Sequence, residues 1–164
     1  MRKPISPALF AAGILMLFSA MADAQPSRKT VSAAEVNGTF RMDFKGKFKS
    51  QSNEIKILAL GGQKVRIAMD LVYPYTLRNG ELMVNMGGLD DEAAISGDTA
   101  VYESGGEGKC KITIKFLKPG TIKVTQAGSD GDCGFGHNVF ATGTYRKVSG
   151  RKPKFEPIGP GSGD

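Results

Sequence analysis

The residues able to do chemistry gather in the last third of the chain. His137 is the one histidine, and Cys110 and Cys133 are the two cysteines. A Ser–His or Cys–His relay would have to use His137, with Cys133 as its best nucleophile. A metal site would combine His137 with Asp130 and Asp132, but ligands on a glycine-rich loop lack the tight spacing of a zinc motif. We therefore predict no catalytic residue, no metal and no cofactor.

Three other groups of residues could serve a function instead of a purely structural role. The acidic run 90–92 lacks the alternating oxygen ligands of a calcium loop. Lys45, Lys47 and Lys49 could bind an anion, although a solvated loop is the commoner use of such a run. The Tyr-Pro-Tyr segment at 73–75 could line a binding site, although a bent strand with half-buried rings is the commoner explanation.

The cysteines also define a covalent framework. An even cysteine count in an exported protein implies a disulfide, and only the pairing Cys110–Cys133 is available. Closing a loop of this length would stabilise the fold by ~3 kcal/mol in the chain-entropy model. The alternative is a pair of buried free thiols.

The N-terminus has the pattern of a secretory signal peptide. Arg2 and Lys3 form a positive region, residues 8–20 are apolar, and Ala-Asp-Ala at 22–24 offers a cleavage site. A membrane anchor is the alternative, but the run is shorter than the ~20 residues that a bilayer span requires. We expect residues 1–24 to be removed and the protein to be periplasmic or secreted, with no stable membrane insertion afterwards.

Removing residues 1–24 from the 164 leaves 140 residues, enough for one domain with a real core. The remaining net charge is near +5, since the removed segment carries two basic residues and one acidic residue. The charge is spread along the chain rather than gathered in a block, which argues against nucleic acid as a partner.

Alternating apolar and polar residues predict about eight or nine short strands and no convincing helix. The strand patterns cover residues 36–44, 54–60, 64–71, 82–86, 92–96, 99–103, 109–116, 122–124 and 137–145. Pro74 is expected to interrupt the ladder, and the Gly-Gly pair at 87–88 to end a strand. This spacing is typical of an antiparallel sandwich or barrel.

A sequence echo favours the barrel. Gly-Thr-Phe-Arg at 38–41 matches Gly-Thr-Tyr-Arg at 143–146. In a closed meander the first and last strands pair, which removes the exposed edges. We predict these segments as the seam, with Tyr145 against Phe40. The domain plan is then a signal peptide (1–24), a flexible leader (25–34), an all-β antiparallel barrel domain (35–148) and a disordered Pro/Gly-rich tail (149–164).

Several segments carry a family resemblance: AAISGDTAVY at 93–102, Cys-x-Ile at 110–112, Cys-Gly-Phe-Gly at 133–136 and Gly-Thr-Tyr at 143–145. Together they resemble small exported bacterial β-barrel proteins, mostly uncharacterised, and loosely the periplasmic and membrane-bound inhibitors of c-type lysozyme. The resemblance covers residues 92–147, about a third of the chain. It implies a lipocalin-like or lysozyme-inhibitor-like barrel of about eight strands.

In those inhibitors a loop with Ser, Gly and a nearby basic residue enters the lysozyme cleft. The resemblance places that role on Ser104, Gly105 and Lys109. A second candidate partner-binding loop follows Cys133, where Phe135 stands between glycines and His137 follows. A restrained loop loses little entropy on binding, so it can serve in recognition. The alternative is a structural corner in which Phe135 caps the barrel.

We therefore expect an exported, non-catalytic binding protein, and the resemblance implies inhibition of a cell-wall hydrolase such as lysozyme. One alternative is a small-molecule carrier, because an eight-stranded barrel can be just wide enough to hold one ligand. The bulky residues predicted to face inward favour a filled core instead. The least favoured alternative is an enzyme that uses His137.

Overall fold

The computed structural model of the 164-residue chain describes residues 30–104 and 109–155. The predicted signal peptide, Gly105 in the 104–109 loop and the end of the predicted tail lie outside these ranges. Within them, no helix is long and apolar enough to cross a bilayer.

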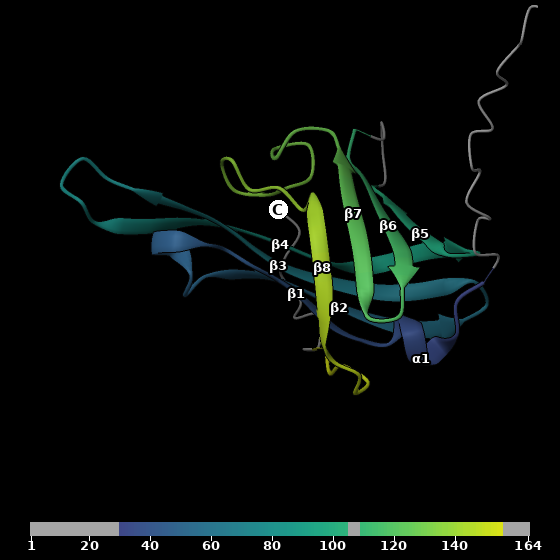
Figure 1. Ribbon diagram of the computed structural model, residues 1–164. Helices are drawn as coiled ribbons and strands as arrows, with labels where there is room; N and C mark the ends of the chain where they lie inside the picture. The colour runs from purple at the N-terminus through teal and green to yellow at the C-terminus, as the bar shows by residue number, and fades with distance from the viewer. Residues whose placement is uncertain (1–29, 105–108, 156–164) are drawn as a thin grey trace, which may run out of the picture.

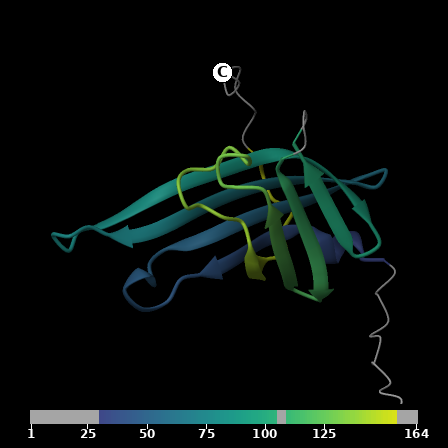
Figure 2. The same cartoon turned by 90° about the horizontal axis from the view of Figure 1, so that it is seen from above.

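The described chain is a closed antiparallel barrel of eight strands, as the alternation predicted (Figures 1 and 2). Each strand pairs with its neighbours in sequence, and β8 closes on β1. The strands are β1 (Gly38–Asp43), β2 (Ser52–Gly61), β3 (Lys64–Thr76), β4 (Leu82–Ser96), β5 (Thr99–Glu103), β6 (Lys111–Lys118), β7 (Thr121–Ala127) and β8 (Gly143–Ser149). A short helix α1 (Ala33–Val36) precedes β1, and a 3-10 turn η1 (Gly46–Phe48) follows it.

The barrel interior is filled by large apolar side chains. Six of the bulky residues predicted to face inward are at most 3% exposed: Phe40, Ile57, Ile67, Ile112, Phe116 and Tyr145. Phe44, predicted to face the same way, is half-buried. Phe40 and Phe116 meet edge to face across the interior, with ring centroids 6.4 Å apart. Burial of this kind is the main stabilising term of the fold.

The predicted seam forms, with a shifted register. Phe40 of β1 lies opposite Lys147 of β8, and Arg41 lies opposite Arg146. Tyr145 is therefore not directly across from Phe40, although both side chains point inward. Strand residues that differ by two positions share a face, so the sequence pattern cannot distinguish these registers.

The N-terminal turn is capped on both sides. The Ser32 hydroxyl accepts from the Glu35 backbone N–H, and the Glu35 carboxylate accepts from the Ser32 N–H. This capping box satisfies donors that a helix start leaves unpaired. Lys147 then donates from Nζ to three backbone carbonyls of this segment, at 2.7–2.9 Å. The last residues of the predicted leader thus have a defined position against β8.

At the other end, β8 runs to Ser149, and the chain continues across the barrel wall. The ring of Phe155 lies over the guanidinium of Arg66 at 4.4 Å. The first residues of the predicted tail therefore have a described position on β3.

Three boundary predictions were wrong. Pro74 does not interrupt β3, and the glycines at 87 and 88 do not end β4; the two strands pair without a break from Lys64↔Ala94 to Thr76↔Leu82. The strand pattern at 137–145 is loop as far as Thr142, because Asn138 has φ 61° and its N–H donates to Asp130. Val139 and Ala141 are buried as loop residues, which imitates the apolar spacing of a strand.

Pro74 is tolerated because of where its nitrogen points. The N–H of Val72 donates to Asn53 Oδ1, on the β2 side. Strand residues alternate, so the nitrogen of Pro74 points the same way. The ladder between β2 and β3 ends at Glu54↔Asp70, so no strand partner awaits a hydrogen bond there. Proline is compatible with such an edge.

Candidate functional site

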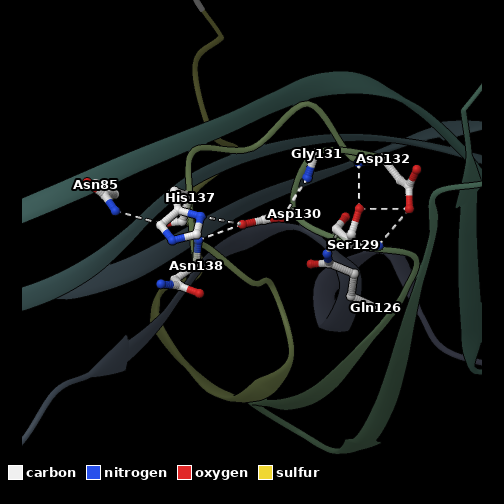
Figure 3. Close-up of polar contacts among 8 residues, drawn as sticks. All are labelled: Asn85, Gln126, Ser129, Asp130, Gly131, Asp132, His137 and Asn138. Atoms are coloured by element: carbon white, nitrogen blue, oxygen red, sulfur yellow. Dashed lines mark hydrogen bonds and ion pairs between the residues drawn. The ribbon is translucent and has the colours of Figure 1, made fainter.

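Asp130, Asp132 and His137 lie on the loop between β7 and β8 (Figure 3), which also contains Cys133. Asp130 accepts from the backbone N–H groups of Asn138 and Gly131, and these bonds hold its pKa below the ordinary range. Asp132 accepts from the backbone N–H and the hydroxyl of Ser129, which lowers its pKa as well. Both carboxylates therefore serve to shape the loop.

Gln126 fixes the base of the same loop. Its side-chain oxygen accepts from the Ala141 N–H at 2.9 Å, and its amide nitrogen donates to the Ser129 carbonyl at 3.2 Å. One side chain thus ties the loop's start to its end, next to the strands it joins (Figure 3).

His137 is a surface residue. Its side chain is 83% exposed, and its Nδ1 lies 3.8 Å from the nearer oxygen of Asp130. The Ser129 hydroxyl of the same loop donates to Asp132 instead. Cys133 is bonded to Cys110 and is not available as a nucleophile. The described residues around His137 therefore do not assemble a nucleophile with an oriented base.

Metal ligation is equally unsupported by the geometry. Across residues 30–104 and 109–155, no three His, Cys, Asp or Glu side chains gather closely enough to hold an ion. His137, Asp130 and Asp132 do not converge on one point. The Asp130 carboxylate accepts from the Gly131 and Asn138 N–H groups, and the Asp132 carboxylate accepts from Ser129.

The Cys110–Cys133 disulfide is present and joins the two predicted partner-binding loops. On one side, the N–H of Ser104 donates to the Cys110 carbonyl, and Lys109 is exposed. On the other side, Phe135 is only 7% exposed and belongs to the core. The aromatic ring is thus placed as in the structural-corner alternative, and it points into the core instead of toward solvent.

A different surface stands out in the structure. The β3–β4 hairpin continues past the rest of the barrel, and both views show it as a long arm with η1 beside its base (Figures 1 and 2). On one face of this arm lie Leu82, Val84 and Met86, which are 52%, 37% and 71% exposed. Pro74 pairs with Val84 and is buried on the same face.

The η1 turn forms a cavity with this face. The cavity holds about 240 Å³ and is lined by Lys47, Phe48, Ser50, Gln51, Pro74, Leu82, Met83 and Val84. The Nζ of Lys47 lies 5.0 Å from the centroid of the Phe48 ring. We call Phe48, Leu82, Val84 and Met86, with Lys45, Lys47 and Lys49, the arm platform.

The opposite face of the arm is also apolar. Tyr73 and Tyr75 stack with their ring centroids 6.3 Å apart, and Met83 pairs with Tyr75 across the ladder. Tyr73 is 40% exposed and Met83 is 39% exposed.

The sequence pattern indicates each segment of this surface separately but does not predict that the segments form one surface. The lysines at 45–49 and the tyrosines at 73 and 75 were each assigned a functional alternative. Leu82, Val84 and Met86 were assigned to a strand face. The missing signal was strand length, because only an unbroken β3 and β4 carry these residues beyond the barrel.

Searches of protein-family models, curated proteins and solved structures found no match for this chain. The structure by itself defines the class: a closed eight-stranded antiparallel barrel with one disulfide and an extended apolar arm.

Proposed function

We propose that this chain is an exported, non-catalytic binding protein that engages its partner with the arm platform. The observation that carries the proposal is the exposure of Leu82, Val84 and Met86 together on one face. Contiguous exposed apolar patches with polar surroundings mark interaction sites in soluble proteins.

Export is part of the proposal. It is supported by the signal-like pattern of residues 1–24 and by the Cys110–Cys133 disulfide, since such bonds persist in oxidising compartments.

The barrel interior favours surface binding over the carrier alternative. Its centre is occupied by Phe40, Phe116 and Tyr145, none more than 3% exposed. The protein's own side chains thus fill the volume in which a barrel of this size would hold a ligand.

The test is a comparison of two matched variants. Leu82→Ser on the arm and Leu117→Ser on β6 alter side chains of similar exposure, 52% and 47%. We expect the wild type and Leu117→Ser to bind a bacterial envelope extract, and Leu82→Ser to lose most of that binding. Equal binding by both variants would show that the arm is not the contact surface.

The resemblance to lysozyme inhibitors makes hydrolase inhibition the specific alternative. It is supported by the exposed Lys109 and by the disulfide that holds Cys110 beside it. Under this alternative, Lys109→Ala would weaken inhibition while Leu82→Ser would not. Unchanged activity of c-, g- and i-type lysozymes with excess protein would exclude it.

A further inference from the structure

We propose that the partner of the arm platform is a bilayer surface containing anionic phospholipid, on which the arm docks peripherally without spanning. This inference rests on the proposed function and names the partner of the same surface. Its basis is the combination of an exposed apolar strand face with lysines on the adjoining η1 turn.

The charges on the platform are not neutralised within the described chain. In residues 30–104 and 109–155, no carboxylate lies within ion-pair distance of Lys45, Lys47 or Lys49. On β3 the basic side chains are paired instead, since Arg66 pairs with Asp90 at 2.8 Å and Lys64 with Glu92 at 2.9 Å. Cations without ion-pair partners are attracted to an anionic surface, and each lysine near a charged leaflet adds to the free energy of binding.

The apolar side chains complete an interfacial pattern. Elements that lie in the membrane interface present apolar residues on one face and Lys or Arg beside them. Phe48, Leu82 and Met86 supply the apolar face, and the three lysines lie on the adjoining η1 turn.

The tip of the arm indicates that it lies flat. Arg78, Asn79 and Glu81 are exposed, and Asn79 Oδ1 accepts from the Glu81 N–H at 3.0 Å. Burying these polar groups in hydrocarbon would be costly, which disfavours entry tip first. A flat arm leaves them at headgroup depth while Leu82 and Met86 reach about 5–10 Å into the boundary.

The cavity fits the same partner. Its walls are apolar at Phe48, Pro74 and Val84, and Lys47 stands among its lining residues. A lipid phosphate beside Lys47 would let the start of an acyl chain enter this hollow of about 240 Å³. Strand addition by a protein partner is less favoured, because Pro74 offers no N–H on the open edge of β3.

The experiment is co-sedimentation of the purified protein with phosphatidylcholine vesicles, with and without phosphatidylglycerol. We expect binding only with phosphatidylglycerol, and weaker binding at high salt. The variant Lys45→Gln/Lys47→Gln/Lys49→Gln should bind on the order of 100-fold more weakly. Its matched control, Lys115→Gln/Lys118→Gln/Lys123→Gln, removes the same charge from β6 and β7 and should bind much as the wild type does.

A second pair of variants tests the apolar part. Leu82→Ser/Met86→Ser should weaken vesicle binding by about tenfold or more, and Leu117→Ser/Val148→Ser should not. All four side chains are exposed, so unchanged thermal unfolding will verify the fold of each variant.

Several results would overturn the inference. Equal binding to neutral and anionic vesicles would remove the role of charge, and release by inorganic phosphate would indicate a site for the free ion. Absence of vesicle binding, with envelope binding still lost in Leu82→Ser, would point to a protein partner. In that last case the proposed function stands and only the lipid inference fails.

Discussion

Gly87 of β4 lies directly beneath Phe135 of the β7–β8 loop. A Cβ at Gly87 would stand 2.9 Å from the Phe135 Cβ and 3.0 Å from a methyl of Val139. The loop can therefore seat its core residues only where β4 has no side chain. The same contact explains why a glycine stands at position 87 inside a long strand.

This contact predicts that Gly87→Ala destabilises the fold by about 1–3 kcal/mol through overpacking. The control is Gly88→Ala, whose added Cβ would meet only the Met69 carbonyl oxygen at 3.5 Å, an ordinary contact. Urea unfolding of both variants measures the difference. Equal stability of the two would mean that the loop does not pack as described.

Loss of the disulfide should lower the free energy of unfolding by about 3 kcal/mol, because Cys110 and Cys133 are 23 residues apart. Cys133→Ser should melt at a lower temperature than the oxidised wild type. The double variant Cys110→Ser/Cys133→Ser should match the reduced wild type. A melting temperature unaffected by reductant would contradict a stabilising role of the bond.

Tyr145 should make the fold sensitive to alkali. Burial raises its pKa to about 12, and its hydroxyl donates to the Ala141 carbonyl at 2.8 Å. The unfolded chain loses this proton near its ordinary pKa of 10.0, whereas the folded chain retains it. The contribution of the protonated Tyr145 to the free energy of unfolding is therefore complete below pH 10. It falls by roughly 2 kcal/mol as the pH rises from 10 to 12.

The measurement compares unfolding free energies of the wild type and Tyr145→Phe between pH 8 and pH 12. At pH 8 the variant should be less stable by about 1 kcal/mol, for the lost hydrogen bond. The stability of both proteins should decline toward pH 12, since other groups titrate in both. The decline should be shallower for Tyr145→Phe, because this variant lacks the titrating hydroxyl. Parallel curves would show that Tyr145 ionises equally in both states.

Lys147 should hold the N-terminal turn on the barrel. Its Nζ donates to the carbonyls of Ala34, Glu35 and Asn37, so Lys147→Met leaves three acceptors without this donor. We expect a loss of about 1–3 kcal/mol and faster hydrogen exchange at the 33–37 amides. The exposed residue Lys123 supplies the control Lys123→Met. Slow exchange retained in Lys147→Met would show that α1 is held by other contacts.

The sequence predicted much of the architecture because its signals are local. Alternation located seven of the eight strands, and the matched Gly-Thr-aromatic-Arg segments located the seam. The disulfide followed from cysteine arithmetic. Errors arose where a residue has two structural uses: Pro74 can break a ladder or occupy an open edge, and Gly87 can end a strand or make room for a loop.

The candidate site was less accessible to sequence reasoning than the fold. Phe135 stands out in the sequence by its place between glycines, and His137 as the one histidine. In the structure Phe135 is 7% exposed in the core, and His137 is an 83% exposed surface residue whose Nδ1 lies 3.8 Å from Asp130. The arm platform consists of ordinary residues at 45–49 and 82–86, which are about forty positions apart. Their proximity depends on the fold of β3 and β4 beside η1.

By itself, the sequence determined the all-β class and the inward face of most strands, because both depend on residue type and a period of two. It also determined the disulfide pairing, because the chain has only two cysteines. Only the tertiary structure decided which apolar faces remain uncovered. A strand face such as Leu82-Val84-Met86 has the same alternation whether it lines a barrel or extends beyond it. Its burial depends on whether another element packs against it, and this decides whether the face belongs to the core or remains exposed.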